Sequence, residues 1–302
     1  MTKQIQETEL ICYKKLPIWN KDTLPKIFQQ KHNTKSGTWA KLTILKGTLK
    51  YYSLDENENV LETIIFDTKN QRPLVEPQAW HKVEPLSDDL ECYLEFYCKK
   101  EEYFHKKYNI SKTHSEVIEL YNLIKNNNKS DKIKNILDLG CGNGRNSLFL
   151  NSKEFNITSL DRNEDSIFNL NNIINQEHLS NIKTKTYDIN SANIIESYDT
   201  VISTVVFMFL NPDKIDTIIE NIQQKTNLNG YNLFVVAMDT EQFPCVMPFS
   251  SPFKENQLKN YYDNENWEII KYNENPGELH KTDGYGNRIK LQFATIVAKK
   301  LN

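Results

Sequence analysis

The sequence predicts a chain in two parts: an all-β cupin-like region over residues 1–100, followed by an α/β, Rossmann-like domain over residues 101–302 with a mostly parallel sheet. Three observations lead to this prediction. β-rich runs separated by turn residues fill the first hundred residues, helices and strands alternate after residue 100, and the stretch LDLGCGNGRN (Leu137–Asn146) stands between a strand and a helix. A chain of 302 residues is long enough for two domains.

The first region reads as short strands. TWAKLTILKGTLKYYSL alternates apolar and polar positions around Gly47, and VLETIIFD and ECYLEFYC are further β-rich runs. Three prolines, at positions 73, 77 and 85, interrupt the middle of the region, and no long helical period is present. We expect an antiparallel β-sandwich or a small barrel.

The second region alternates helices and strands. HSEVIELYNLIKN is a predicted helix, KNILDLG a buried strand, GRNSLFLNSKE a helix, FNITSLD a strand and EDSIFNLNNIINQEH a helix. IKTKTYD, YDTVISTVVFMF and YNLFVVAM are the next strands. NWEIIKYN and RIKLQFATIVAKK close the domain as two antiparallel strands joined by a loop of roughly fifteen residues.

The glycine-rich stretch indicates a cationic ligand. A dinucleotide fingerprint would need a glycine where Arg145 stands, so the pattern is an acidic residue, Asp138, followed by Gly140, Gly142 and Gly144. Glycines allow a ligand to lie directly on the backbone. Since Asp138 disfavours an anion, the pattern suits S-adenosylmethionine, which carries a sulfonium and an ammonium group.

Two more carboxylates follow predicted strands. Asp161 ends the second strand, 21 residues after Gly140, where a ribose diol would meet an acceptor, and Asp188 ends the third strand, where it could accept from an adenine amino group. Each of them could also be a helix cap or a turn residue. Three carboxylates at the carboxyl ends of three successive strands favour a ligand site, because open α/β sheets bind ligands at that edge.

Composition argues against several classes of protein. The net charge of −3 has no basic excess of the kind that nucleic-acid binding requires. The longest apolar run, Val201–Leu210, is too short to cross a membrane, and the amino terminus lacks a signal peptide's apolar core. Five cysteines without CxxC spacing predict neither disulfides nor a zinc site. We expect a cytoplasmic protein, and association between copies of the chain stays open.

From residue 101 onward the chain resembles the class I methyltransferases, and more closely the tellurite-resistance methyltransferases. The resemblance is carried by YFHKKYNISKTHSEV, LDLGCGNGRNSLFL, STVVFMFL, GYNLFVVAMDT and GELHKTDGYGNRIKLQFAT. The glycine motif is typical of the whole superfamily, and the last string is the distinctive one. The first hundred residues resemble the cupin-like domain that precedes the enzyme in some members.

The resemblance implies transfer of methyl groups from S-adenosylmethionine to tellurite, and to selenite, with S-adenosylhomocysteine as the other product. Together with the motifs above, it gives a set of expected cofactor contacts on the segment before the first helix, in the glycine loop and at the strand ends. These are Tyr103, Lys107, Tyr108, His114, Asp138, Gly140, Cys141, Gly142, Gly144, Arg145, Asn146, Asp161, Arg162, Asn163, Asp188, Ile189, Thr204 and Val205. For Arg145 and Asn146, a surface position in the first turn of the helix is an equal alternative.

The substrate is expected at the loop GELHKTDGYGNR, which brings together His280, Lys281 and Arg288. A small oxyanion needs fixed donors and positive charge near the sulfonium. Lys281 stands where relatives often have arginine, so the planar two-pronged donor geometry is lost. The alternatives are a turn cap for His280, solvation for Lys281 and a surface ion pair for Arg288.

Two segments have no assigned role. FPCVMPFSSPF (Phe243–Phe253) is either a lid or a connecting loop. His32, His81 and Glu76 are the types of residue that hold a metal in cupins, but the close His-x-His pair is absent, so we expect a metal-free β domain for packing, association or sensing.

Two other functions stay open. The chain could methylate an organic thiol, amine or hydroxyl, which predicts an apolar pocket with a positioned base. It could also be a non-catalytic S-adenosylmethionine sensor. The cationic loop argues against the first, and the intact glycine and carboxylate set argues against the second.

Overall fold

The computed structural model of the chain describes residues 9–127 and 134–302 and divides into two units, Met1–Asn109 and Ile110–Asn302. This division falls nine residues after the predicted boundary between residues 100 and 101. The reason is α1 (Tyr103–Tyr108), which packs on β1 (Leu10–Lys15) and β7 (Glu91–Lys99). Lys106 of α1 donates from Nζ to the Ser36 carbonyl at 2.9 Å, which ties the helix to the first unit.

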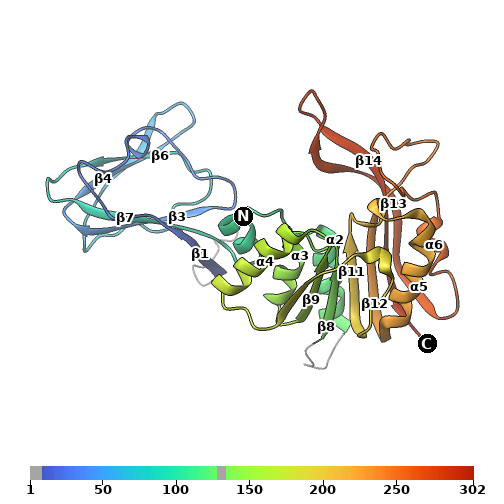
Figure 1. Cartoon of the computed structure of the whole chain (residues 1–302). Coiled ribbons are helices and arrows are strands. Elements are labelled where there is room, and N and C mark those ends of the chain that lie inside the picture. Colours follow the sequence, from blue (N-terminus) through green and yellow to red (C-terminus); the bar gives the residue numbers. More distant parts are fainter. Residues whose placement is uncertain (1–8, 128–133) are drawn as a thin grey trace. The chain divides into compact units, whose positions relative to one another are not determined.

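The first unit consists of two antiparallel sheets (Figure 1). In one sheet β7 pairs with β1, with β2 (Trp19–Asn20) and with β3 (Trp39–Lys46). In the other, β4 (Leu49–Leu54) lies between β5 (Val60–Phe66) and β6 (His81–Pro85). Two short 3-10 helices complete the unit, η2 (Lys26–Gln29) and η3 (Lys100–Glu102).

Alternating burial along these strands forms the core of the first unit. In β4 the side chains of Leu49, Tyr51 and Leu54 are buried. They belong to a cluster that both sheets supply: Leu24, Ala40, Leu42, Ile44, Leu49, Tyr51, Phe66, Val75, Val83, Leu90 and Cys92. The period of two, with one face of each sheet turned inward, is what the sequence of a β-sandwich requires.

The second unit has a seven-stranded sheet in the order β10-β9-β8-β11-β12-β14-β13. Its strands are β8 (Asn135–Leu139), β9 (Asn156–Asp161), β10 (Ile182–Thr186), β11 (Tyr198–Thr204), β12 (Thr226–Ala237), β13 (Trp267–Thr282) and β14 (Arg288–Lys300). The first five pair in parallel with one another, and β14 is antiparallel to both β12 and β13. From β8 the chain adds β9 and β10 on one side and then β11 and β12 on the other, so the strand order reverses between β8 and β11. The loops after these two strands meet at the edge where open sheets bind ligands.

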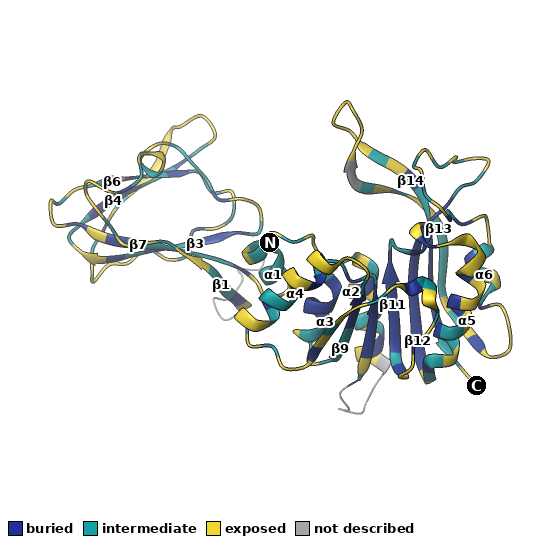
Figure 2. Ribbon diagram, viewed as in Figure 1, coloured by how far each residue is buried: buried dark blue, intermediate teal, exposed yellow. Residues whose placement is uncertain are grey.

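The helices of this unit are α2 (Ser115–Asn127), α3 (Arg145–Asn151), α4 (Glu164–Gln176), α5 (Ile215–Lys225) and α6 (Gln257–Asn260), with short 3-10 turns η4 (Ile189–Ser191), η5 (Phe207–Phe209) and η6 (Pro212–Lys214). Figure 2 shows the central strands buried and the outer sides of the helices exposed. The helices within the described residues are too short and too polar to cross a membrane.

The structure corrects three details of the predicted elements. β11 ends at Thr204, and the apolar residues after it form η5 because Phe207 and Met208 pack into the core from a 3-10 turn. α5 is absent from the predicted elements, although its buried isoleucines at positions 215, 218, 219 and 222 follow the helical period.

The third correction concerns the loop predicted between the last two strands. β13 runs on to Thr282, so most of that loop is strand, and the turn covers only residues 283–287. Asp283 holds this turn by accepting from the backbone N–H groups of Tyr285 and Asn287, both at 2.9 Å. The cationic segment is therefore a long β-hairpin.

Candidate active site

The loop between β8 and α3 holds three glycines with positive φ: Gly140 (73°), Gly142 (53°) and Gly144 (83°). A Cβ at Gly140 would lie 2.4 Å from Val206, and one at Gly144 would lie 2.4 Å from Leu170, so packing requires both glycines. A Cβ at Gly142 would have nothing within 4 Å. Open space beside this backbone is where a ligand can lie directly on the chain.

Asp138 supports the loop from within. Its carboxylate is only 1% exposed and accepts from the Ser147 hydroxyl at 2.6 Å, and Ser147 in turn accepts from the Ser159 hydroxyl at 2.8 Å. Burial raises the pKa of Asp138 to about 6, although the hydrogen bond from Ser147 favours the charged form. Asp138 therefore offers almost no surface for direct contact, and its charge acts on the loop through the protein.

Asp161, at the carboxyl end of β9, holds the same loop and stays partly exposed. Its Oδ2 accepts from the Gly142 N–H at 2.8 Å, and its Oδ1 accepts from the Asn163 N–H at 2.8 Å. One carboxylate thus fixes the open glycine and still faces solvent, so a diol could bind beside Gly142.

The other strand-end residues have structural roles. Asp188 is exposed and caps η4, since its Oδ1 accepts from the Asn190 N–H at 3.0 Å. Asn163 caps α4 by accepting from the Ser166 N–H at 2.9 Å. Ile189 is buried in the core and Arg162 is exposed. The structure therefore confirms that Asp188 caps a helix. Binding of a ligand by the same carboxylate stays a prediction.

Arg145 and Asn146 form a network with the end of β11. Asn146 is buried and donates from Nδ2 to the Thr204 hydroxyl at 3.0 Å, and Arg145 donates to the same hydroxyl at 3.3 Å. The His114 N–H donates to Asn146 Oδ1 at 3.1 Å. The structure thus brings together four expected contacts that are up to 90 residues apart in the sequence.

Arg145 is a desolvated cation. Burial lowers the pKa of its guanidinium, and the charge of Asp138 opposes that shift. Among the described residues, the ion pairs closer than 4.0 Å do not include Arg145. A partly buried cation in this state would be stabilised by an anion.

Val205 adopts φ of 63°, directly after β11. The left-handed region is a genuine outlier for a β-branched residue, and such strain persists only where the surroundings enforce it. Here the Val205 N–H donates to the Val235 carbonyl at 2.7 Å, which holds the residue in place. The strain turns the chain at the same edge as Thr204 and the glycine loop.

A pocket of about 330 Å³ opens next to this network. It is bounded by α2, by the ends of β11 and β12, and by the paired strands β13 and β14. Its lining comprises His114, Ser115, Glu116, Arg145, Val205, Val235, Asn273, Asn275, Pro276, Gly277, Glu278, Leu279, Phe293 and Thr295. Three expected cofactor contacts, His114, Arg145 and Val205, are therefore also walls of a cavity.

Most of this lining was missed from the sequence. Asn275 and Phe293 face each other because β13 and β14 pair in that register, which no local pattern specifies. Glu116 pairs with Lys271, whose Nζ lies 2.6 Å from Glu116 Oε2 and 2.7 Å from Glu119 Oε2, so two carboxylates share one lysine at this wall. The signal that could have found these residues was the amphipathic alternation of the two final strands.

The predicted substrate residues lie on the hairpin. His280 and Lys281 belong to β13, but their side chains lie outside what the structure describes. Arg288 begins β14, is exposed, and stands opposite Thr282. Leu279, next to His280, lines the pocket, so the strand that carries the histidine runs along the cavity.

Three expected cofactor contacts lie on α1 in the first unit. Lys107 donates from Nζ to the Tyr103 hydroxyl at 2.8 Å and lies 5.5 Å from the centre of the Tyr108 ring. This cluster joins aromatic rings to a cation on one short helix. Its role in cofactor binding stays a prediction.

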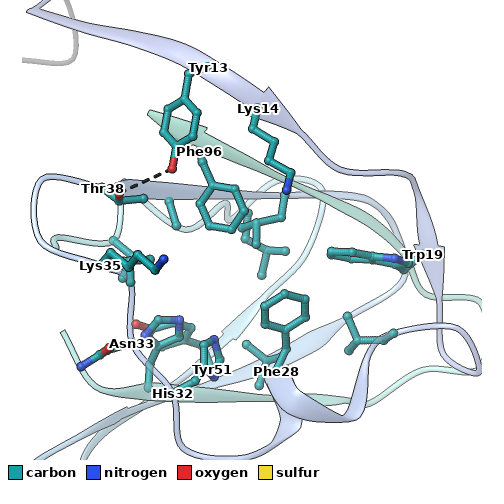
Figure 3. Close-up of a pocket in the computed structure, with 18 of the residues that line it drawn as sticks. Tyr13, Lys14, Trp19, Phe28, His32, Asn33, Lys35, Thr38, Tyr51 and Phe96 are labelled. Carbon is teal, nitrogen blue, oxygen red and sulfur yellow. Dashed lines mark hydrogen bonds between the residues drawn. The ribbon is translucent and has the colours of Figure 1, made fainter. Parts of the chain in front are cut away.

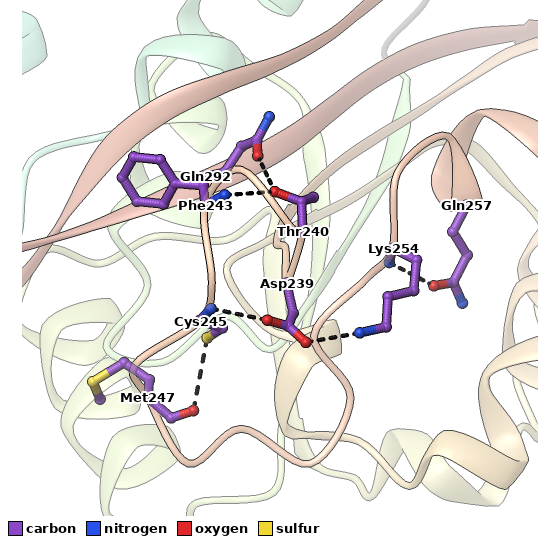
Figure 4. A network of polar contacts seen from close by, with 8 residues as sticks. All are labelled: Asp239, Thr240, Phe243, Cys245, Met247, Lys254, Gln257 and Gln292. Carbon is purple, nitrogen blue, oxygen red and sulfur yellow. Dashed lines mark hydrogen bonds and ion pairs between the residues drawn. The ribbon is translucent and has the colours of Figure 1, made fainter.

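The segment after β12 is anchored at its base (Figure 4). Asp239 accepts from the Cys245 N–H at 2.9 Å and pairs with Lys254 Nζ at 2.7 Å. These contacts, together with the backbone hydrogen bonds, lower the pKa of Asp239. Cys245, Met247 and Phe249 pack against the buried cluster of Met208, Ala237 and Leu291, and so do the pocket residues Val205 and Leu279. The action of the segment as a lid stays a prediction.

Two family models match the chain. The model described as tellurite resistance protein TehB matches residues 96–297, and the model described as TehB-like domain matches residues 14–94. The second model thus matches the all-β part of the chain, and the first matches the α/β part.

Individual proteins match over nearly the whole chain. A protein of Haemophilus influenzae (strain 10810), named probable S-adenosyl-L-methionine-dependent methyltransferase TehB, is 55% identical over 294 residues, which are 97% of this chain and 99% of the relative. A protein of Eikenella corrodens named hemagglutinin 1 is 40% identical over 249 residues, 82% of this chain and 80% of the relative. The crystal structure of TehB from Haemophilus influenzae matches with a TM-score of 0.89 at 55% identity and covers 98% of this chain and 100% of that one.

Proposed function

Because the chain belongs to the tellurite resistance protein TehB family, we propose that it is an S-adenosylmethionine-dependent methyltransferase that methylates tellurite, and selenite as well. The observation that carries the proposal is the open backbone at Gly142 beside the half-buried carboxylate of Asp161, next to a pocket that contains a desolvated arginine.

The residues present fit the cofactor. Gly142 leaves free the space that a Cβ would fill, and Asp161 presents carboxylate oxygens to hydroxyl donors. The negative charge of Asp138 behind the loop suits a cationic ligand. The strained backbone at Val205 and the buried Thr204 hydroxyl form the neighbouring wall.

S-adenosylmethionine would supply a methyl group on a sulfonium: the tellurium lone pair forms the new Te–C bond as the C–S bond breaks, and the bonding electron pair stays on sulfur. Tellurium is a soft nucleophile and needs no strong general base. What the protein must provide is orientation and exclusion of water.

Arg145 is the partly buried cation that could orient the oxyanion. It lines the 330 Å³ pocket, and Thr204 fixes its guanidinium. We propose that the hairpin residues His280, Lys281 and Arg288 supply further donors to the same anion. Charge that is fixed in a desolvated site stabilises a developing transition state more strongly than charge in water.

A second candidate is methylation of an organic thiol, amine or hydroxyl. It is favoured by the apolar part of the pocket, where Val205, Leu279 and Phe293 line one side. In this case His114 or Glu278 would be the positioned base. An apolar lining suits a carbon skeleton better than it suits a small oxyanion.

The release of S-adenosylhomocysteine tests both candidates. The full chain is incubated with S-adenosylmethionine and one candidate substrate in each reaction. The substrates are tellurite, selenite, a small thiol, an amine and an alcohol. We expect release with the two oxyanions. Release with only an organic substrate would replace the tellurite assignment by the second candidate, and no release with any substrate despite cofactor binding would favour a sensor.

A further inference from the structure

The first unit encloses a cavity of about 370 Å³ that is separate from the methyltransferase site (Figure 3). Residues of both sheets line it: Ala40 and Leu42 of β3 and Phe96 of β7 from one sheet, Tyr51 of β4 and Val83 of β6 from the other. A void of this size is within the range of small-molecule sites and is far larger than a packing defect.

Aromatic rings form much of the wall. Trp19 and Phe28 lie 5.4 Å apart between ring centres, and Phe28 lies 5.3 Å from the ring of His32. Figure 3 shows the rings of Trp19, Phe28 and Phe96 facing the same space. Flat, polarisable walls on more than one side favour a planar apolar body that can stack or meet a ring edge.

Two imidazoles lie together at one end. His32 and His81 have ring centres 4.1 Å apart, and their backbones form an antiparallel bridge. His32 Nδ1 lies 2.9 Å from the Gln30 carbonyl, and His81 Nδ1 lies 2.8 Å from the Ala79 carbonyl. These carbonyls assign the proton of each ring to Nδ1, which leaves Nε2 as an acceptor.

Both imidazoles are neutral at physiological pH. Burial lowers the pKa of His32, and burial together with the neighbouring His32 lowers the pKa of His81 to about 4. The pair therefore provides hydrogen-bond acceptors and no charge. Glu76, the carboxylate expected near them, instead accepts from the Trp39 indole N–H at 2.7 Å, so the third member of the cupin-like set is engaged elsewhere.

The charged side chains among the described lining residues are all lysines. Lys14, Lys35 and Lys106 line the cavity, and none of the described residues that line it is acidic. Figure 3 shows Lys14 and Lys35 reaching in from different sides. Lys106 is held in place, since its Nζ donates to the Thr38 hydroxyl at 3.0 Å and to the Ser36 carbonyl. The cavity is therefore complementary to an anion.

We propose that this cavity binds a small organic monoanion with a flat aromatic body and a hydroxyl group, of the hydroxybenzoate class. The carboxylate would pair with the lysines, the ring would lie among Trp19, Phe28 and Phe96, and the hydroxyl would donate to a neutral imidazole. An inorganic oxyanion such as selenite fits less well, because it would lose its hydration against apolar walls that return no hydrogen bonds. The proposal stands apart from the methyltransferase assignment.

The test measures binding of 4-hydroxybenzoate to the full chain by calorimetry and by ligand-observed NMR. The comparators are 4-hydroxybenzamide, which has the same shape without the charge, and selenite. All titrations are done with saturating S-adenosylhomocysteine, which occupies the cofactor site of the second unit, and the variants below separate binding in the cavity from binding in the pocket of that unit. We expect the acid to bind at least about threefold more tightly than the amide, in line with the energy of an exposed ion pair.

Variants locate the binding. Lys14→Met with Lys35→Met should remove the preference for the acid, because both lysines line the cavity and are exposed, so the fold is not at risk. The matched control is Lys26→Met with Lys46→Met, two exposed lysines of the same unit that do not line the cavity. The control should keep the wild-type preference.

Three results would overturn the proposal. The first is equal affinity for acid and amide, the second is selenite binding that is tighter than binding of the acid and is lost in Lys14→Met with Lys35→Met, and the third is no binding of the acid up to about 5 mM, beyond which affinity is too weak to indicate a built site.

Discussion

Gly142 and Gly140 have similar backbone conformations and different neighbours. A Cβ at Gly140 collides with Val206, whereas a Cβ at Gly142 meets nothing, so the second glycine is free of any packing requirement of its own. Its N–H is held by Asp161. The pair thus separates a glycine that packing requires from a glycine whose open side we predict to face a ligand.

Gly142→Ala should therefore fold and lose cofactor affinity. The alanine would cost about 1–2 kcal/mol for its left-handed backbone, and its methyl group would occupy the open space beside the loop. Calorimetry should show S-adenosylmethionine binding weakened at least tenfold, about 1.4 kcal/mol. Gly286→Ala is the control, because Gly286 also has positive φ (83°) and nothing within 4 Å of a Cβ. Equal affinities of the two variants would contradict the assignment.

Asp161→Ala should weaken S-adenosylmethionine binding by roughly 1.5–3 kcal/mol, the range for hydrogen bonds to a charged group. Part of this loss would come from the Gly142 N–H, which loses its acceptor. Unchanged affinity in a folded variant, measured by calorimetry, would remove Asp161 from the cofactor site.

Asp138 should make cofactor binding depend on pH. Its pKa is raised to about 6, so the carboxyl is neutral below this pH and charged above it. The charged form favours a cationic ligand, so affinity should fall as the pH drops from about 7 to 5. Asp138→Asn should bind more weakly at pH 8 and lack this step. A step of wild-type size in Asp138→Asn would assign the effect to another group.

At the scale of elements, the β13–β14 hairpin is the segment that we expect to distinguish tellurite chemistry from other methylation. Its turn is confined to residues 283–287, and its strands carry His280 and Lys281 on one side and Arg288 on the other. The pairing of β13 with β14 is continuous from Lys271 to Glu278 and shifts register between Glu278 and Thr282, so His280 and Lys281 lie at an irregularity of the hairpin.

His280→Ala and Arg288→Ala should each lower turnover with tellurite by about 10²–10³ if the group stabilises charge only in the transition state. Cofactor affinity should change little. A loss confined to apparent substrate affinity would indicate uniform binding of the anion. Wild-type turnover in both folded variants would exclude the hairpin from the mechanism and favour an organic substrate.

At the scale of the molecule, the division of the chain separates two sets of expected cofactor contacts. The contacts of the glycine loop, Asp161 and Thr204 lie in Ile110–Asn302, whereas Tyr103, Lys107 and Tyr108 lie in Met1–Asn109. A pair of fragments can therefore measure what α1 contributes.

A fragment of residues 101–302 should fold and bind S-adenosylmethionine as the full chain does, because the β-sandwich supplies none of the glycine and carboxylate set. A fragment of residues 110–302 should fold equally well and bind more weakly if α1 contacts the cofactor. Calorimetry, with circular dichroism as the folding control, checks both. Absence of binding by the longer fragment would show that the sandwich is required.

The sequence by itself determined the fold class of each region, and it predicted the edge of the sheet at which a ligand would bind. Alternating apolar residues predict the sandwich, and strand–glycine–helix order with Asp161 at a strand end predicts the open α/β sheet, because both signals are local. Because these signals are local, they also explain why the strand predicted through Phe207 and Met208 was wrong. Apolar residues such as these can be buried either in a strand or in a 3-10 turn, and only tertiary packing decides which of the two forms.

The tertiary structure alone decided which side chains share a site. The burial of Asp138, the network of Arg145 with Asn146 and Thr204, and the wall that Phe293 adds depend on contacts between distant segments. The same holds for the cavity around His32 and His81, which two sheets must form together. Strand order and register set these contacts, and no residue pattern within one segment encodes them.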